Sequence, residues 1–194
     1  MFSLPDKLDR RKKYTRMVLK DSLIQLMNEK TFSSITVKEV CALADINRST
    51  FYTHFTDVHD LLYSIEEEII EEMNKYLNAF NFIVEEESIQ MTEQLLVYIK
   101  DRKEIFEALL ENNTGTSFEK RVMDIARLFL INKTDTANID AASYLSTFIV
   151  SGAIHVIKDW LLNDQTQSPK QMAELISQFC NKGLGAMENE KPRE

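Results

Sequence analysis

Glycine and proline are scarce in this chain, which has four glycines and three prolines among 194 residues. Average usage of these two residues together is roughly 12%. Because β-sandwiches, barrels and strand-rich α/β folds need many tight turns, the scarcity argues against all three. We therefore expect an all-helical (all-α) protein.

Cysteine and long apolar runs are also scarce. Cys41 and Cys180 are the two cysteines, which match no metal-ligand spacing and are too few for a disulfide framework. We therefore expect a reduced, cytoplasmic protein with no metal and no other cofactor. The longest mostly apolar stretch, residues 145–157, contains polar side chains and is shorter than the roughly 20 residues that span a bilayer. We expect no membrane partner.

The motifs of common catalytic sites are missing as well. The sequence has no nucleophile elbow, no P-loop, no G-x-G-x-x-G motif and no zinc-protease helix motif. Four glycines also leave little material for loops that cradle phosphates. We expect that the protein is not an enzyme.

Charge is distributed unevenly along the chain. Residues 1–55 hold ten Lys and Arg against six Asp and Glu, a net charge of +4 in a chain whose total is −8. A basic segment on an acidic protein favours contact between that segment and a polyanion. Ordinary variation of surface charge explains the same numbers about equally well, so charge alone does not decide.

Two short capped helices are predicted after a first long helix. Thr36 and Glu39 have the spacing of a capping box, which predicts a helix that begins there. After a turn, Asn47 can cap a second helix over residues 48–55. Helices this short are not stable alone in water. A helix-turn-helix, in which a longer helix packs behind them, supplies the missing contacts.

The second short helix is predicted to pack through its aromatic side. Phe51 and Phe55 lie one helical turn apart and can anchor the helix inward. The remaining side is polar, and a polar helix face held on such a scaffold is what a helix-turn-helix protein presents to the major groove.

The polar side carries groups suited to DNA. Arg48 has the donor fork that reads guanine, and the small side chains of Ser49 and Thr53 let the backbone approach base edges. Tyr52 and His54 are suited to phosphate oxygens, which position a protein without reading sequence.

The stretch from residue 35 to residue 62 resembles the DNA-binding domain of the TetR/AcrR transcriptional regulators. The most specific part is Ser49-Thr50-Phe51-Tyr52-Thr53-His54-Phe55, which matches the family's small-Thr-apolar-Tyr-x-His-aromatic core. The resemblance covers about residues 10–65. It implies DNA contacts, to phosphates or to bases, from Thr36, Lys38, Arg48, Ser49, Thr50, Tyr52, Thr53 and His54.

Two residues depart from the family pattern. Asp45 stands in the turn where the family usually has glycine, so the turn must adopt a conformation that a non-glycine residue tolerates. Val58 stands where a lysine usually grips phosphate at the start of the next helix. We expect Thr56 or the helix-start amides to replace that lysine, and residues 10–13 to supply positive charge.

The rest of the chain is predicted to be helical. We expect a helix-turn-helix DNA-binding domain over residues 1–56 and a helical effector-binding and dimerisation domain over residues 57–194, with about nine helices in all. The helix over 138–163 is apolar nearly all round and must be covered on both sides. With the helix over 169–184 it would form a homodimer interface, and the dimer would bind a near-palindromic double-stranded DNA operator.

An unknown small-molecule effector is the further partner that we expect. The aromatic side chains beyond residue 57 could line its cavity, although each is individually more typical of a core. His155, among apolar neighbours, is more typical of a core histidine than of a ligand contact. The aromatic candidates are Phe80, Phe82, Tyr98, Phe106, Phe118, Phe129, Tyr144 and Phe148.

Two alternatives remain open at this point. One is a helical small-molecule-binding protein without DNA, and the other is an adaptor that uses its apolar helices for protein partners. Neither explains the basic first segment with its two short capped helices. The runs Ser151-Gly152-Ala153 and Asp159-Trp160-Leu161 resemble a TetR subgroup that includes a dihydroxyacetone-kinase operon activator. Both repression and activation therefore stay open.

Overall fold

The structure is a computed structural model that describes residues 4–79, 84–111, 118–133, 139–163 and 166–182. Within residues 4–8, 129–133, 139–142 and 182 it describes the helical backbone alone.

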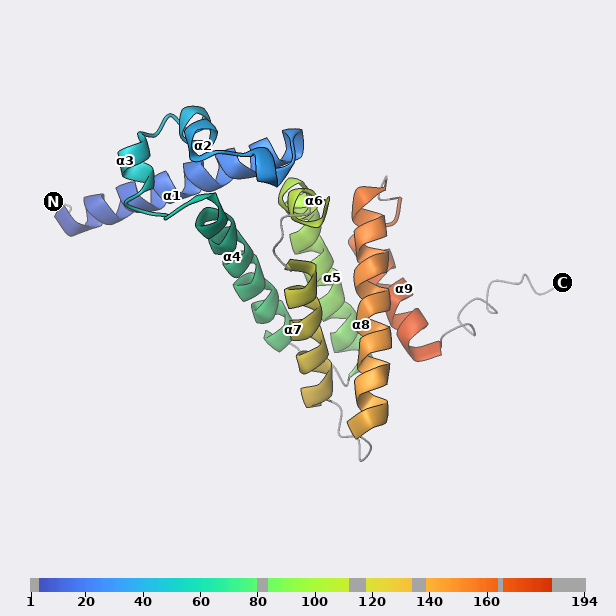
Figure 1. Ribbon diagram of the computed structural model, residues 1–194. Helices are drawn as coiled ribbons and strands as arrows, with labels where there is room; N and C mark the ends of the chain where they lie inside the picture. Colours follow the sequence, from blue (N-terminus) through green and yellow to red (C-terminus); the bar gives the residue numbers. More distant parts are fainter. Residues whose placement is uncertain (1–3, 80–83, 112–117, 134–138, 164–165, 183–194) are drawn as a thin grey trace. The chain divides into compact units, whose positions relative to one another are not determined.

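Every element in the described ranges is helical, which confirms the predicted all-α class. Nine α-helices and one short 3-10 helix, Phe32–Ser34, make up this part of the chain. The α-helices, labelled in Figure 1, are α1 (Leu4–Glu29), α2 (Val37–Leu43), α3 (Arg48–Phe51), α4 (Val58–Ala79), α5 (Glu85–Asp101), α6 (Lys103–Glu111), α7 (Phe118–Lys133), α8 (Ile139–Leu162) and α9 (Pro169–Lys182).

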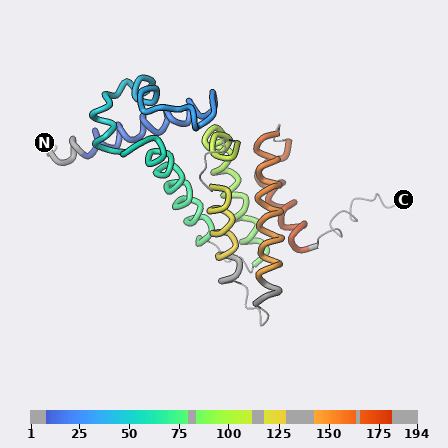
Figure 2. The backbone as a smooth tube through the Cα atoms, viewed as in Figure 1, coloured from blue at the N-terminus to red at the C-terminus, as the bar shows by residue number. Residues whose placement is uncertain are grey.

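The second short helix is shorter than predicted. We expected it to reach residue 55, but α3 ends at Phe51. The reason is a tightening of the backbone, because the amides of Thr53 and His54 bond to carbonyls three residues back, at Thr50 (3.1 Å) and Phe51 (2.8 Å). The segment from α3 through residue 55 nevertheless stays coiled, as the backbone trace in Figure 2 shows.

The chain divides into two compact units. The first comprises residues 1–70 with 104–117, and the second comprises residues 71–103 with 118–194. A compact unit is not the same as a functional domain, so the predicted division after residue 56 stays a prediction.

The core of the first unit gathers apolar side chains from α1 to α4. Leu23 of α1, Val40 of α2, Phe51 of α3 and Leu61 of α4 are all completely buried. α2 packs against α1 and α3 against α2. Burying a side chain of this size contributes about 1.5–3 kcal/mol, and this is what makes helices as short as α2 and α3 stable.

The second unit pairs its helices in two ways. α5 packs against α9, and α7 packs against α8 (Figure 1). The predicted cap of α9 is confirmed, since the Ser168 amide donates to Gln171 Oε1 (2.8 Å) and the Gln171 amide donates to Ser168 Oγ (3.2 Å). Just before it, the Trp160 indole donates to the Gln167 carbonyl (3.0 Å) and joins the end of α8 to the start of α9.

One side of α8 is apolar and exposed. Tyr144 is 79% exposed, Phe148 is 78% exposed and Leu145 is 57% exposed. Exposed apolar side chains scattered singly are ordinary, but three of this size within five residues form a patch. We predicted that α8 must be covered on both sides, and the side that is uncovered in this chain lies in its N-terminal half.

The apolar part of α8 is longer than the sequence suggested. Within the part of the chain that the structure describes, residues 143–162 form the one helical stretch long and apolar enough to cross a membrane by length and composition. The expectation that the apolar stretch is too short was therefore wrong, because the helix extends past residues 145–157 at both ends. Core helices of soluble proteins that are mostly buried pass the same test. In this chain 22% of the stretch is buried, and α8 packs on α7 and α9.

Candidate nucleic-acid interface

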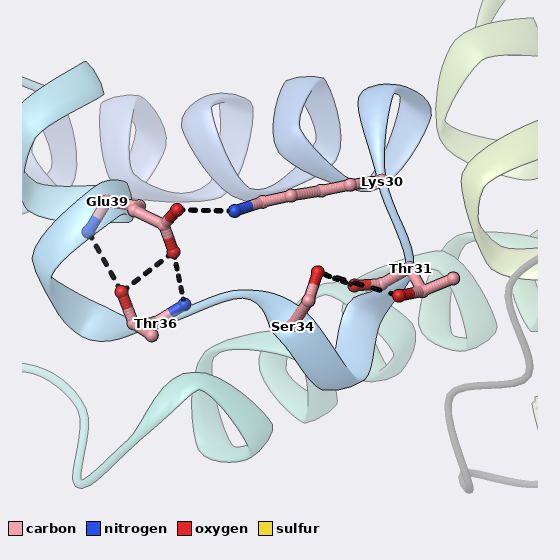
Figure 3. A network of polar contacts seen from close by, with 5 residues as sticks. All are labelled: Lys30, Thr31, Ser34, Thr36 and Glu39. Carbon is pink, nitrogen blue, oxygen red and sulfur yellow. Dashed lines mark hydrogen bonds and ion pairs between the residues drawn. The ribbon is translucent and has the colours of Figure 1, made fainter.

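The start of α2 is fixed by a closed network of polar contacts (Figure 3). Thr36 and Glu39 form the predicted capping box, in which the Thr36 hydroxyl accepts from the Glu39 amide (3.4 Å) and the Thr36 amide donates to Glu39 Oε2 (3.0 Å). The Thr36 hydroxyl also donates to Glu39 Oε2 (2.8 Å), and Lys30 Nζ donates to Glu39 Oε1 (2.5 Å). These donors stabilise the carboxylate.

The same network sets the charge state of Glu39. The hydrogen bond from Lys30, then those from the hydroxyl and amide of Thr36, lower the pKa of Glu39 from 4.5 to about 2. Glu39 is therefore fully charged at neutral pH. Its bonds to Thr36 and Lys30 hold the start of α2 in place. Thr36 and Lys38, which lie at this helix start, are both exposed.

In the turn between α2 and α3, Asp45 adopts the backbone conformation for which the family usually has a glycine. Asp45 has φ 52°, in the left-handed region that favours glycine. The amide of Ile46 bonds to the Cys41 carbonyl (3.0 Å) and that of Asp45 to the Ala42 carbonyl (3.4 Å). This is the bonding pattern of a Schellman motif. Aspartate is among the few non-glycine residues that occupy such positions with any frequency.

The segment from residue 47 to residue 55 is anchored by two rings. Phe51 is completely buried, Phe55 is 3% exposed, and their ring centres lie 5.9 Å apart. The predicted cap is present, because Asn47 Oδ1 accepts from the Ser49 amide (2.9 Å). The prediction that the aromatic side packs inward is confirmed.

The polar side of this segment faces solvent. Among the predicted contact residues, Tyr52 is 58% exposed, and Thr50 and His54 are half-buried. The three remaining ones on this segment, Arg48, Ser49 and Thr53, are exposed. Exposure makes a DNA contact possible, and the role of each residue stays a prediction.

α1 contributes a cation that the sequence interpretation did not single out. The guanidinium of Arg16 lies over the ring of Phe55, at 4.7 Å from the ring centre. Burial, and after it the positive charges of Arg16 and Lys12, lower the pKa of His54. The i, i+4 spacing of Lys12 and Arg16 on one helix face was the signal in the sequence that could have identified this pair.

Not all cations of the first unit are available to a polyanion. Lys20 Nζ pairs with Glu68 (2.5 Å), Lys30 pairs with Glu39, and exposed Lys13 pairs with Asp9 (3.2 Å). Arg11, Lys12 and Lys38 are exposed. The positive charge that faces solvent near the short helices therefore comes from the exposed side of α1, from Lys38 of α2 and from Arg48 of α3.

The start of α4 is organised around Asp60. Asp57 Oδ1 accepts from the Asp60 amide (2.8 Å) and caps the helix. The Asp60 carboxylate in turn accepts from the Thr56 amide (2.8 Å) and hydroxyl (3.3 Å). Thr56, which we expected to replace a phosphate-binding lysine, thus already uses both of its donors within the protein, and Val58 is buried.

Most of the candidate effector residues belong to the second unit. Tyr98, Phe106 and Phe118 are buried, although Phe106 belongs to the first unit. Tyr144 and Phe148 are exposed. Phe80 and Phe82 lie outside the described residues, as does the side chain of Phe129.

The interpretation of His155 as a core residue was wrong. Its side chain is 66% exposed, its Nδ1 lies 2.7 Å from the Ser151 carbonyl, and its Nε2 lies 4.0 Å from Glu119. With Trp160 and Met172 it lines a cleft of about 630 Å³ where α8 meets α9. Among the residues that the structure describes, no group of three or more His, Cys, Asp or Glu side chains could hold a metal ion.

Comparison with known proteins agrees with this architecture. Residues 86–182, half of the chain, match the TetR family described as a transcriptional regulator C-terminal region. An uncharacterized HTH-type transcriptional regulator of Haemophilus influenzae is 29% identical over 114 residues, which cover 55% of this chain. The match spans 54% of that protein, so the chain spans about half the length of the curated relative that it matches.

Solved structures share the fold at low sequence identity. A TetR transcriptional regulator from Streptococcus agalactiae 2603V superposes with a TM-score of 0.66 at 20% identity, over 91% of this chain and 98% of that one. The dihydroxyacetone kinase operon activator DhaS superposes with a TM-score of 0.58 at 16% identity, over 86% of this chain and 93% of that one. At these identities the likeness concerns the fold.

Proposed function

The chain belongs to the TetR family of transcriptional regulators, and from this premise we propose that it binds a near-palindromic DNA operator as a homodimer. The segment from residue 48 to residue 54 lies in the major groove of each half-site. Such half-sites lie about 34–36 Å apart, so that two copies related by a two-fold axis reach them from one side of the duplex.

One observation carries this proposal. The reading segment, residues 48–54, exposes Arg48, Ser49 and Thr53 while Phe51 is completely buried beneath them. A buried ring holds the polar side in a fixed direction, and fixed direction is what hydrogen bonding to base edges requires. The exposed cations of α1 and α2 supply the contacts to phosphate that position the segment.

The homodimer is proposed to form through α8 and α9. Its support is the exposed patch of Tyr144, Leu145 and Phe148, since an apolar surface of this kind marks an interaction site. A two-fold axis brings the same patch of both copies together and buries it. The dimer in turn doubles the number of base contacts, which one short segment cannot supply alone.

A small-molecule effector is proposed to control DNA binding. It would bind the second unit and change the affinity for operator only if it binds one of two conformations more tightly than the other. Because the target is genomic DNA, we propose that the protein acts in the cytoplasm. Deletion of the gene distinguishes repression from activation, because transcription of the target genes rises when a repressor is lost and falls when an activator is lost.

The test is an anisotropy titration of the full chain with the DNA upstream of its own gene, at several salt concentrations. We expect saturable binding. The logarithm of the observed association constant should fall linearly with the logarithm of the salt concentration. Binding that does not saturate, or that ignores salt, would contradict the proposal.

Two variants test the site itself. Arg48→Ala should weaken operator binding by about 1–3 kcal/mol and relax specificity at one base pair, and Tyr52→Phe should weaken it without loss of helical circular dichroism. Lys100→Ala, which removes an exposed cation from α5, is the matched control and should bind normally. If both variants of the reading segment bind like the unmodified protein, the site lies elsewhere.

A further inference from the structure

The direction of the Thr53 hydroxyl is determined by its partner. Thr53 Oγ1 lies 2.6 Å from the carbonyl oxygen of Thr50. A carbonyl oxygen accepts hydrogen bonds and cannot donate them. The Thr53 hydroxyl must therefore be the donor, and its single hydrogen points back into the protein.

The direction of the Ser49 hydroxyl is determined in two steps. The Ser49 amide donates to the side chain of Asn47 at 2.9 Å, so the Asn47 atom at that position must be the oxygen, Oδ1. Ser49 Oγ lies 3.0 Å from the same oxygen. Because that oxygen accepts from both groups of Ser49, the Ser49 hydroxyl also points its hydrogen into the protein.

The exposed sides of these two hydroxyls therefore offer lone pairs alone. Ser49 and Thr53 are both exposed and lie four residues apart on the reading segment. In the major groove the hydrogen-bond donors are the exocyclic amino groups of adenine and cytosine, whereas guanine O6, thymine O4 and the purine N7 atoms are acceptors. Phosphate oxygens are acceptors too, so neither hydroxyl can bind phosphate while its internal bond is intact.

We propose, as a refinement that rests on the proposed function, that the hydroxyl oxygens of Ser49 and Thr53 accept hydrogen bonds from exocyclic amino groups of adenine or cytosine in each operator half-site. Arg48 carries donors alone and is complementary to the acceptors of guanine. The reading segment thus combines one donor side chain with two acceptors, and the two hydroxyls specify bases and do not hold the backbone.

The experiment begins with selection of an operator from random DNA by the full-length dimer. Each adenine of the selected half-site is then replaced symmetrically by purine, and each cytosine by 2-pyrimidinone, which removes the amino group and leaves the ring. We expect two positions per half-site at which this replacement weakens binding about five- to tenfold for each hydrogen bond lost. Because the replacement is symmetric, the dimer loses two such bonds, one in each half-site.

Hydroxyl-free variants then assign the two positions. Thr53→Val, which has nearly the same shape, should be insensitive to the amino group at one position, and Ser49→Ala at the other. Thr53→Ser should restore the sensitivity that Thr53→Val loses. Because each comparison uses the same DNA, any effect of the analogue on the duplex itself cancels, and circular dichroism verifies that the variants are folded.

The possible outcomes separate the two proposals. If no sequence is selected, the proposed function fails and this inference fails with it. If a sequence is selected but Thr53→Val and Ser49→Ala keep the full amino-group sensitivity of the unmodified protein, the inference alone is overturned. The same holds if binding depends at those positions on N7, tested with 7-deazaguanine and 7-deazaadenine, and not on the amino groups.

Discussion

The guanidinium of Arg16 lies 4.7 Å from the centre of the Phe55 ring, and this contact joins α1 to the residue that directly follows the reading segment. The ring is buried beneath the segment, so the cation sits at the border between core and surface. Arg16 also lowers the pKa of His54, the neighbour of Phe55. Electrostatics and packing of the reading segment therefore both depend on α1.

Arg16→Met should raise the pKa of His54. The positive charge of Arg16 disfavours the imidazolium, so its removal favours the protonated form while the stem of methionine keeps the packing on Phe55. Titration of the His54 ring protons by NMR measures the shift. Lys13→Met removes an equal charge that is paired with Asp9 and should leave the titration unchanged. A fall of the His54 pKa in Arg16→Met would contradict the assignment.

DNA binding should become tighter as the pH falls if His54 lies against phosphate. Burial and the cations of α1 lower its pKa in the free protein, whereas a phosphate nearby raises it. Binding then takes up a proton, and affinity falls as the pH rises through the interval between the two pKa values. Anisotropy titrations at several pH values measure this, and His54→Gln should flatten the profile. A profile that is equally steep in His54→Gln would assign the effect to another group.

Glu39→Gln should destabilise the protein at neutral pH, and the loss should vanish in acid. The carboxyl has a pKa of about 2 in the folded chain against an ordinary 4.5. A lowered pKa means that the charged form stabilises the fold above about pH 4.5, and that this contribution disappears as the pH falls through about 2. Urea unfolding followed by circular dichroism measures the difference. Glu29→Gln, at the exposed end of α1, is the control and should destabilise the protein less than Glu39→Gln at neutral pH.

Asp45→Ala should be less stable than Asp45→Gly by about 1 kcal/mol, because a left-handed backbone places the alanine Cβ against the carbonyl oxygen. The same exchange at Ala42, an exposed position inside α2, should reverse the order, with glycine less stable by about 0.5–1 kcal/mol. Urea unfolding of the four proteins gives both differences. Equal ordering at the two positions would show that the turn does not hold Asp45 in this conformation.

Phe148→Glu should dissociate the dimer. Because both copies carry the substitution, a two-fold dimer places two carboxylates in one apolar interface. We therefore expect the dissociation constant of the dimer to rise by more than about tenfold. Light scattering after size exclusion measures the mass. Val97→Glu introduces the same charge at an exposed apolar position of α5 and should leave the dimer intact. A dimer that survives Phe148→Glu would move the interface away from this patch.

Local signals in the sequence predicted the parts of the fold that depend on near neighbours. The caps at Thr36, Asn47 and Ser168 all form as predicted, because a cap joins residues two or three positions apart. The turn at Asp45 was recognised in another way, by comparison with the family pattern, which usually has glycine there, and Asp45 does adopt the left-handed backbone, with φ 52°.

The parts that could not be predicted depend on contacts between distant segments. The contact of Arg16 with Phe55 joins α1 to the segment between α3 and α4, and nothing in the sequence near either residue indicates the other. The end of α3 was placed too late because the backbone tightens where Phe55 returns to the core. His155 was assigned to the core because the sequence of an apolar helix does not say which side its neighbours cover.

The division of labour within the reading segment has an evolutionary consequence. Phe51 within the segment and Phe55 directly after it are buried and stabilise it, and the side chains that face solvent contribute little to its stability. Duplicated copies of such a gene can therefore exchange those outward residues and acquire a new target sequence in single mutational steps, without passing through an unfolded intermediate. The buried scaffold determines which segment enters the groove, and it leaves the base sequence that this segment recognises free to change.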